Sequence, residues 1–320
     1  MSSAENHTLI HRAFLASGSR CGVRFLVPAV VVALALPAAL AAQEGQAFDA
    51  RCSPLPFADI AVKHPIDDNC GIEGKSAADD ANHAQNQAKN DFCAKGDPVT
   101  VTQDDFVKLQ AAVQDAGIPF GSTKKLPADR AVLRDLITGS SGAKLGEGTK
   151  VRFVAFVLLA AAKQGAQPKG KAHYSDTNTG ESVNCGEPGN EPNDIHIPTV
   201  QDSEPGADEC ASVTAEISPH SRPAGWTPKA LNGAGVPLRF TGHLFFDGSH
   251  KPCAEGKGNP KRISSWEIHP VYAVDVCTGA TLADCPAGDD SKWHPLATPP
   301  APAQPASPPA ASPPASPPAL

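Results

Sequence analysis

Apolar and polar residues alternate in the second half of the chain, which is typical of β-strands with one buried face. Five such segments lie at residues 149–163, 193–200, 211–218, 236–248 and 264–277. A short helical segment with turn signals, residues 225–235, separates the third strand from the fourth. Three strands, a helix and two strands is the order of a five-stranded OB barrel. A small β-sandwich with a covering helix has the same order and is the alternative.

The residues before 146 follow a helical pattern instead. Good helix formers fill 74–94, and a threonine–aspartate pair with capping-box spacing begins a helix predicted over 101–117. A third helix is predicted over 126–139, because a proline stands at its first turn and a glycine at its end. The chain is therefore predicted to be mainly β. An OB-like barrel over 146–286 follows a helical, loop-rich region over 43–145.

The two ends of the chain have compositions of their own. Two arginines precede an apolar run at 25–42, which ends in the small-residue pattern Ala39-Leu40-Ala41. We interpret residues 1–42 as a signal peptide, with a membrane anchor as the alternative, so that no transmembrane span is expected after cleavage. The last residues, 287–320, become a tail rich in proline, alanine and serine, which cannot bury a core and is predicted to be disordered. The predicted location is the periplasm or the exterior of the cell.

Net charge and cysteine content narrow the class of protein. The formal net charge is -7, which argues against a non-specific nucleic-acid binder. Eight cysteines follow the apolar run, an even number that favours disulfides in an oxidising compartment. Three lie before residue 100 and five after residue 180, so complete pairing requires at least one bond between the two groups. These candidate disulfide cysteines are Cys52, Cys70, Cys93, Cys185, Cys210, Cys253, Cys277 and Cys285.

Acidic and histidine side chains recur on neighbouring strands of the predicted barrel. Because side chains alternate along a strand, Asp194 and His196 share one face of the second strand, and Glu267 and His269 share one face of the fifth. Glu216 lies on the third strand between them. Imidazole and carboxylate groups are ligands for zinc or manganese, which could activate water in a phosphodiesterase or nuclease-like hydrolase. The alternative is a structural network, since buried carboxylates and histidines can satisfy one another.

The loops beside these strands are rich in basic residues. In OB barrels the loops between the first and second strands and between the fourth and fifth contact ligands. In this chain they could bind an anionic polymer such as a nucleic acid or a polysaccharide, although exposed lysine is also an ordinary solubilising residue. The first loop holds Lys163, Lys169, Lys171, His173 and Tyr174, and the second holds His250, Lys251, Lys257, Lys261 and Arg262.

Four segments also resemble a family of exported bacterial proteins of unknown function. They are "NDIHI", "VTAEISP", "VPLRFTGHLFFDGSH" and "WEIHPVYAVDVC", in this order. The resemblance covers roughly residues 146–277 and implies an OB-like fold without an established activity. This chain departs from the pattern by a tryptophan before Glu267, by a cysteine-bearing insert after His250 and by its helical N-terminal part. The sequence thus predicts an exported, disulfide-stabilised OB-like module that is structural or binds an unknown ligand. A metal-dependent hydrolase is the second hypothesis.

Overall fold

The computed structural model describes residues 76, 82–90, 96–159, 171–175, 188–190, 192–204, 207–219, 222–223 and 225–296. All of them belong to the compact unit formed by residues 42–320. The predicted signal peptide, most of the Pro/Ala/Ser-rich tail, and Cys52, Cys70, Cys93 and Cys185 lie outside the described residues. No helix in the described part is long and apolar enough to cross a bilayer.

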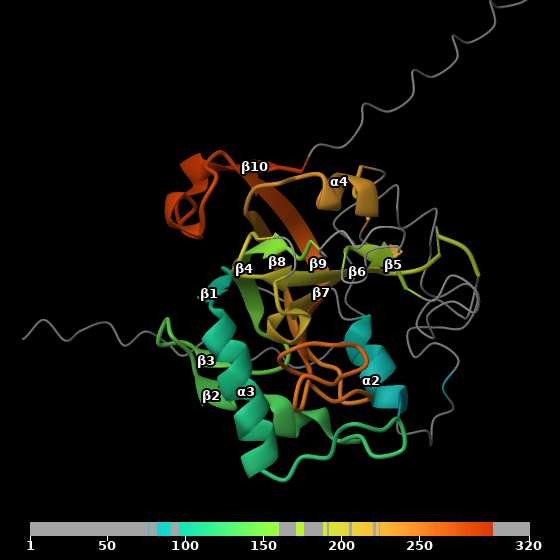
Figure 1. Cartoon of the computed structure of the whole chain (residues 1–320). Coiled ribbons are helices and arrows are strands. Elements are labelled where there is room, and N and C mark those ends of the chain that lie inside the picture. The colour runs from blue at the N-terminus through green and yellow to red at the C-terminus, as the bar shows by residue number, and fades with distance from the viewer. Residues whose placement is uncertain are drawn as a thin grey trace, which may run out of the picture. The chain divides into compact units, whose positions relative to one another are not determined.

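The fold is mainly β, as predicted, with one large mixed sheet and few helices (Figure 1). The helices are α2 (Asn82–Lys89), α3 (Gln103–Asp115) and α4 (Pro228–Asn232). Single 3-10 turns occur at Arg130–Leu133, Glu209–Ala211, Leu282–Asp284 and Asp290–Lys292. The strands are β1 (Val99–Val101), β2 (Ile137–Thr138), β3 (Lys144–Leu145), β4 (Lys150–Val157), β5 (His173–Tyr174), β6 (Ile195–Val200), β7 (Val213–Ile217), β8 (Leu238–Phe246), β9 (Trp266–Cys277) and β10 (Trp293–Pro295).

The five long strands pair in a closed circuit. The sheet has the order β1-β4-β8-β9-β7-β6-β5, and an additional pairing joins β4 to β6 through Phe156 and Val200. The pair β7–β9 is parallel, whereas the other pairs of the circuit are antiparallel. These five strands are the ones that the alternating pattern predicts, because each buries one apolar face.

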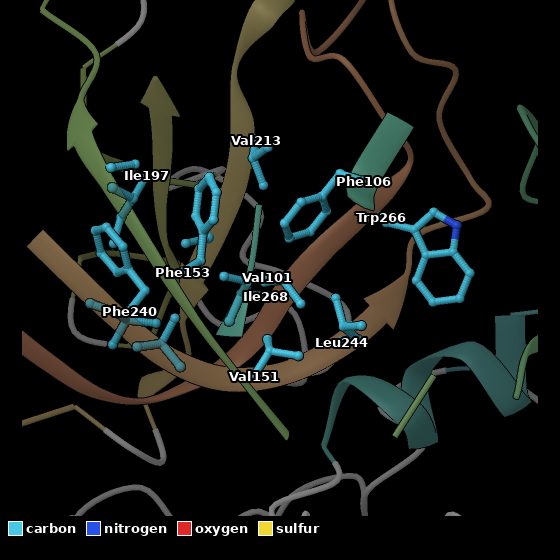
Figure 2. Close-up of a cluster of buried hydrophobic side chains, with 14 of the residues drawn as sticks. Val101, Phe106, Val151, Phe153, Ile197, Val213, Phe240, Leu244, Trp266 and Ile268 are labelled. Atoms are coloured by element: carbon cyan, nitrogen blue, oxygen red, sulfur yellow. The ribbon is translucent and has the colours of Figure 1, made fainter. Parts of the chain in front are cut away.

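The hydrophobic core lies between the strands of the circuit and extends to α3 (Figure 2). Ile197, Phe240 and Ile268 are fully buried members contributed by β6, β8 and β9. Phe106 of α3 joins them, and its ring centroid lies 5.3 Å from that of Phe153 in an edge-on contact. The amphipathic face of α3 thus covers part of the core.

The N-terminal region differs from the helical prediction in two places. The helix over 101–117 is confirmed, and the Asp105 carboxylate accepts a hydrogen bond of 2.9 Å from the backbone N–H of Thr102. The helix over 126–139 is wrong: a 3-10 turn ends at Leu133, Asp135 has a positive φ of 49°, and β2 then pairs with β3. In addition, β1 pairs in parallel with β4, so this region adds a strand to the main sheet.

Two disulfides fasten the described part of the chain. Cys210–Cys253 links the turn before β7 to the loop between β8 and β9, and Cys277–Cys285 closes the end of β9. Their sequence separations are 43 and 8 residues. In the chain-entropy estimate, loops of these sizes correspond to about 4 and about 2.5 kcal/mol.

These two bonds also constrain the other four cysteines. If all eight pair within one chain, the remaining four cysteines form two bonds. Two of Cys52, Cys70 and Cys93 then bond to each other, and the third bonds to Cys185. Peptide mapping of the non-reduced protein is expected to recover that cross-link. Free Cys185 in a fully folded monomer would contradict the prediction.

Candidate functional site

The predicted polar side chains lie on the face of the strands that points away from the core. On β9, Trp266 and Ile268 enter the hydrophobic core, whereas Glu267 and His269 project from the opposite face. On the neighbouring strands, His196 of β6 is the register partner of Glu216 of β7. The alternation of side chains along the strands therefore gathers these groups on one face.

His269 is the centre of this arrangement. Its Nε2 lies 3.4 Å from Oδ2 of Asp194 and 3.2 Å from Oε2 of Glu216. The side chains of His269 and Asp194 are 0% exposed, and that of Glu216 is 3% exposed. Burial alone would favour a neutral ring, but these two carboxylates raise the pKa of His269 to about 10. The ring is therefore an imidazolium held between two carboxylates.

Helix α2 covers the same face from outside the sheet. The ammonium of Lys89 lies 3.8 Å from Oε2 of Glu216. One turn earlier, Gln85 donates a hydrogen bond of 3.2 Å to Oδ1 of Asp247 and accepts one of 2.9 Å from the N–H of Gly248. Figure 1 shows α2 beside the loop between β8 and β9. Sequence reasoning missed both α2 residues, because a polar helix without an apolar stripe carries no signal of what it covers.

The carboxylates beside His269 are ionised. Burial works to raise the pKa of Asp194, but the hydrogen bond with His269 outweighs it and lowers this pKa. Burial acts on Glu216 in the same way, yet the neighbouring His196 and Lys89 hold its pKa well below the usual value. Asp194, Glu216, His269 and Lys89 are called the inner network from here on.

Arg262 forms a second buried ion pair beside the inner network. The sequence places Arg262 in a basic, ligand-facing loop, but its side chain is only 1% exposed. One guanidinium nitrogen lies 2.8 Å from Oδ2 of Asp247, and another contacts Oε1 of Glu267. Arg262 is therefore not available to a ligand in solution. Glu267, a predicted metal ligand, is held by Arg262 instead of joining His269.

The pKa values of the two carboxylates bound to Arg262 shift in opposite directions. Burial would raise the pKa of Asp247, but Arg262 and then His250 keep it well below the usual value. Burial and the negative charge of Glu216 raise the pKa of Glu267 well above its usual value, against the opposing effect of Arg262. The lowered pKa values of Asp194, Glu216 and Asp247 reflect the cationic groups beside them, which are His269, Lys89 and Arg262.

The inner network also has spacing that suits a metal. Ligand atoms of Asp194, Glu216 and His269 all lie within 4.8 Å of one another. A tetrahedral zinc with bonds of about 2.0–2.1 Å has ligand atoms roughly 3.3–3.4 Å apart, close to the 3.4 and 3.2 Å found here. A catalytic metal also needs an open coordination position for water or substrate. Burial of both Asp194 and His269 argues against such a position.

The predicted basic residues of the loop between β8 and β9 differ in solvent exposure. Lys251, Lys257 and Lys261 are exposed, unlike Arg262. The nitrogen of Lys261 lies 3.6 Å from Oε2 of Glu209. Because Cys210–Cys253 and the buried Arg262 anchor this loop, its lysines extend from a fixed backbone.

The pKa shifts predict how stability depends on pH. His269 has a folded pKa of about 10 against an ordinary 6.5, so its contribution is complete below 6.5 and is lost as the pH rises toward 10. The raised pKa of Glu267 gives a contribution that is complete below about 4.5 and declines as the pH rises above that value. The lowered pKa values of Asp194, Glu216 and Asp247 give stability that is present above about 4.5 and lost at lower pH. Urea unfolding should show stability that falls as the pH rises from about 6.5 toward 10 and as it drops below about 4.5; a flat profile from pH 6 to 10 would contradict this.

Comparison with known proteins does not indicate a function for this chain. No protein-family model matches the chain, and neither do any characterised proteins or solved structures that were compared with it. The function must therefore be inferred from the residues and their arrangement.

Proposed function

We propose that this chain is an exported, disulfide-stabilised module with an OB-like barrel, which binds an anionic ligand through the loop between β8 and β9. The observation that carries this proposal is the closed circuit β4-β6-β7-β9-β8. It follows the strand order of an OB barrel, in which the third and fifth strands are neighbours. The loops that contact ligands in OB barrels are those after the first and fourth strands. The loop after β8 is the second of these.

Export is supported by two independent features. The apolar run at 25–42 ends in a small-residue cleavage pattern. The described residues contain the disulfides Cys210–Cys253 and Cys277–Cys285, which persist in oxidising compartments. Membership in the exported OB-like family suggested by the four sequence segments is part of the same proposal.

The polar face is assigned a structural role within this proposal. Its central histidine is fully buried against two carboxylates, and α2 lies over it. Buried polar groups that satisfy one another can specify a unique packing of neighbouring elements. The inner network therefore fixes β6, β7 and β9 against α2 and leaves ligand binding to the exposed loops.

The ligand chemistry follows from what the loop presents. Lys251, Lys257 and Lys261 provide three exposed cations on an anchored backbone, and Glu255 is the one acidic residue between them. Single-stranded nucleic acid requires exposed aromatic rings for stacking. Phe245 and Phe246, the aromatic residues before this loop, are both 0% exposed. An acidic polysaccharide, which binds through charge without base stacking, fits this loop better.

The test is a binding titration with a sulfated polysaccharide and with single-stranded DNA at two salt concentrations. We expect the polysaccharide to bind at low salt, more weakly at high salt because ionic contacts are screened, and more tightly than the DNA. The triple variant Lys251→Gln, Lys257→Gln, Lys261→Gln should lose most of this binding. A matched variant that removes three exposed lysines elsewhere, Lys108→Gln, Lys144→Gln, Lys292→Gln, should retain it. Equal loss in both variants, or no binding at low salt, would refute the proposal.

A metal-dependent hydrolase is the second candidate function. It is favoured by the close spacing of ligand atoms in Asp194, Glu216 and His269. Zinc or manganese bound there would polarise water for hydrolysis. Metal analysis of the purified protein separates the two candidates. One metal per chain that disappears in His269→Gln would favour the hydrolase over the structural network, whereas metal content below a tenth of that would exclude it.

A further inference from the structure

Two histidines face each other across neighbouring strands at the solvent-exposed edge of the polar face. His173 of β5 and His196 of β6 are register partners in an antiparallel pair, so their side chains lie on the same face. Their ring centroids are 5.7 Å apart, with an angle of 59° between the ring planes. His173 is exposed, and the side chain of His196 is 26% exposed. Unlike His269, both can be reached from solvent.

Each ring has a second contact that fixes one of its nitrogens. Nδ1 of His173 lies 2.7 Å from the carbonyl oxygen of Lys171. A carbonyl oxygen only accepts hydrogen bonds, so Nδ1 carries the proton and Nε2 keeps its lone pair. On the other ring, Nε2 of His196 lies 3.2 Å from Oε1 of Glu216. A proton on this Nε2 is favoured by the carboxylate, which leaves Nδ1 of His196 as the nitrogen with a lone pair.

This pattern is the one found around histidines that bind metals. A metal-ligating histidine almost always donates its other N–H to a carboxylate or to a backbone carbonyl. Here the carbonyl oxygen of Lys171 is hydrogen-bonded to His173, and the carboxylate of Glu216 lies 3.2 Å from Nε2 of His196. The spacing agrees as well, because two imidazoles on one tetrahedral zinc have centroids roughly 5–5.5 Å apart when the bonds are about 2.0–2.1 Å.

We infer that His173 and His196 form a two-histidine site for a borderline divalent cation such as zinc or copper, with Glu216 orienting His196. Imidazole nitrogen suits these metals better than calcium or magnesium. Lys89 does not occupy the site, because it binds Oε2 of Glu216, whereas His196 faces Oε1. Because His173 is exposed and the side chain of His196 is 26% exposed, a cation can reach the pair from solvent. This inference is independent of the polysaccharide proposal.

The test uses the oxidised full-length protein, purified through a tag without histidines, stripped of metal and titrated with Zn²⁺ by calorimetry. We expect one zinc per chain, and at least about a tenfold loss of affinity in His173→Ala. Because His173 is exposed, this variant should fold like the wild type. The control His294→Ala, which removes an exposed histidine on β10, should bind as the wild type does.

Spectroscopy with Cu²⁺ distinguishes this site from the inner network. Electron paramagnetic resonance should show coupling to two imidazole nitrogens in the wild type and to one in His173→Ala. Zinc binding that is unchanged in His173→Ala, or equally weakened in His294→Ala, would overturn the inference. So would a single zinc that survives in His173→Ala and disappears in His269→Gln, because it would place the metal in the inner network.

Discussion

Replacing His269 with alanine is expected to lower the free energy of unfolding by about 3–5 kcal/mol, the cost of breaking a buried ion pair by removing one partner. The imidazolium separates Asp194 from Glu216, with Nε2 at 3.4 and 3.2 Å from their oxygens. Without it, two buried carboxylates face each other, and Lys89 at 3.8 Å from Glu216 cannot compensate both. Equilibrium denaturation of the oxidised protein measures the loss.

Two further variants test the reason for this loss. Adding Asp194→Asn to His269→Ala should recover part of the stability, because it removes one of the two buried negative charges that face each other. His294→Ala, at an exposed position, should change stability by no more than about 0.5 kcal/mol. Losses that simply add in the double variant would contradict a direct interaction between Asp194 and His269.

Arg262→Met is expected to be similarly destabilising, by about 3–5 kcal/mol. The guanidinium is 1% exposed and bridges Asp247 of the β8 end to Glu267 of β9. Methionine can fill the space of the stem but leaves Asp247 buried without its main cationic partner, with His250 Nδ1 at 2.8 Å and the weaker effect of Lys89 remaining. Arg262→Lys should lose less, although a single ammonium cannot reproduce the two-sided contact of a planar guanidinium.

The adjacent residue provides the matched control for Arg262. Lys261 is exposed, so Lys261→Met should change stability by no more than about 0.5 kcal/mol. Denaturation curves of both variants at neutral pH make the comparison. Equal, small effects would mean that Arg262 lies in solvent as the other loop cations do.

The sequence predicts the framework well because the strands have one apolar face. Five strands and the helix after the third follow from alternation and turn signals, and the bounds of β6, β8 and β9 agree within a few residues. The error over 126–139 has a physical cause. Its apolar residues have helical spacing, yet Leu133 is buried from a 3-10 turn and Ile137 pairs with Leu145 in β2–β3. Local periodicity does not distinguish these tertiary contacts from one helix face.

The candidate site was predicted in part. Period-two alternation places Asp194, Glu216 and His269 on one face, and the structure brings them together. It does not bring Glu267 to His269, because Arg262 binds it across five residues of sequence. From the sequence alone, an arginine at the end of a lysine-rich loop is expected to be solvent-exposed, because its buried partners are not evident. Lys89 could not be assigned either, since it lies 127 positions before Glu216 in the sequence.

The protonation state of His269 tests the central claim most directly. The claim is that the polar face closes on itself around an imidazolium, with a pKa of about 10. Nitrogen-15 NMR of the oxidised full-length protein at pH 8, with the signal assigned by its absence in His269→Gln, reports both ring nitrogens. Our account predicts a ring protonated at Nδ1 and Nε2 at this pH. A neutral ring, or a ring with one nitrogen bound to a metal, would contradict it.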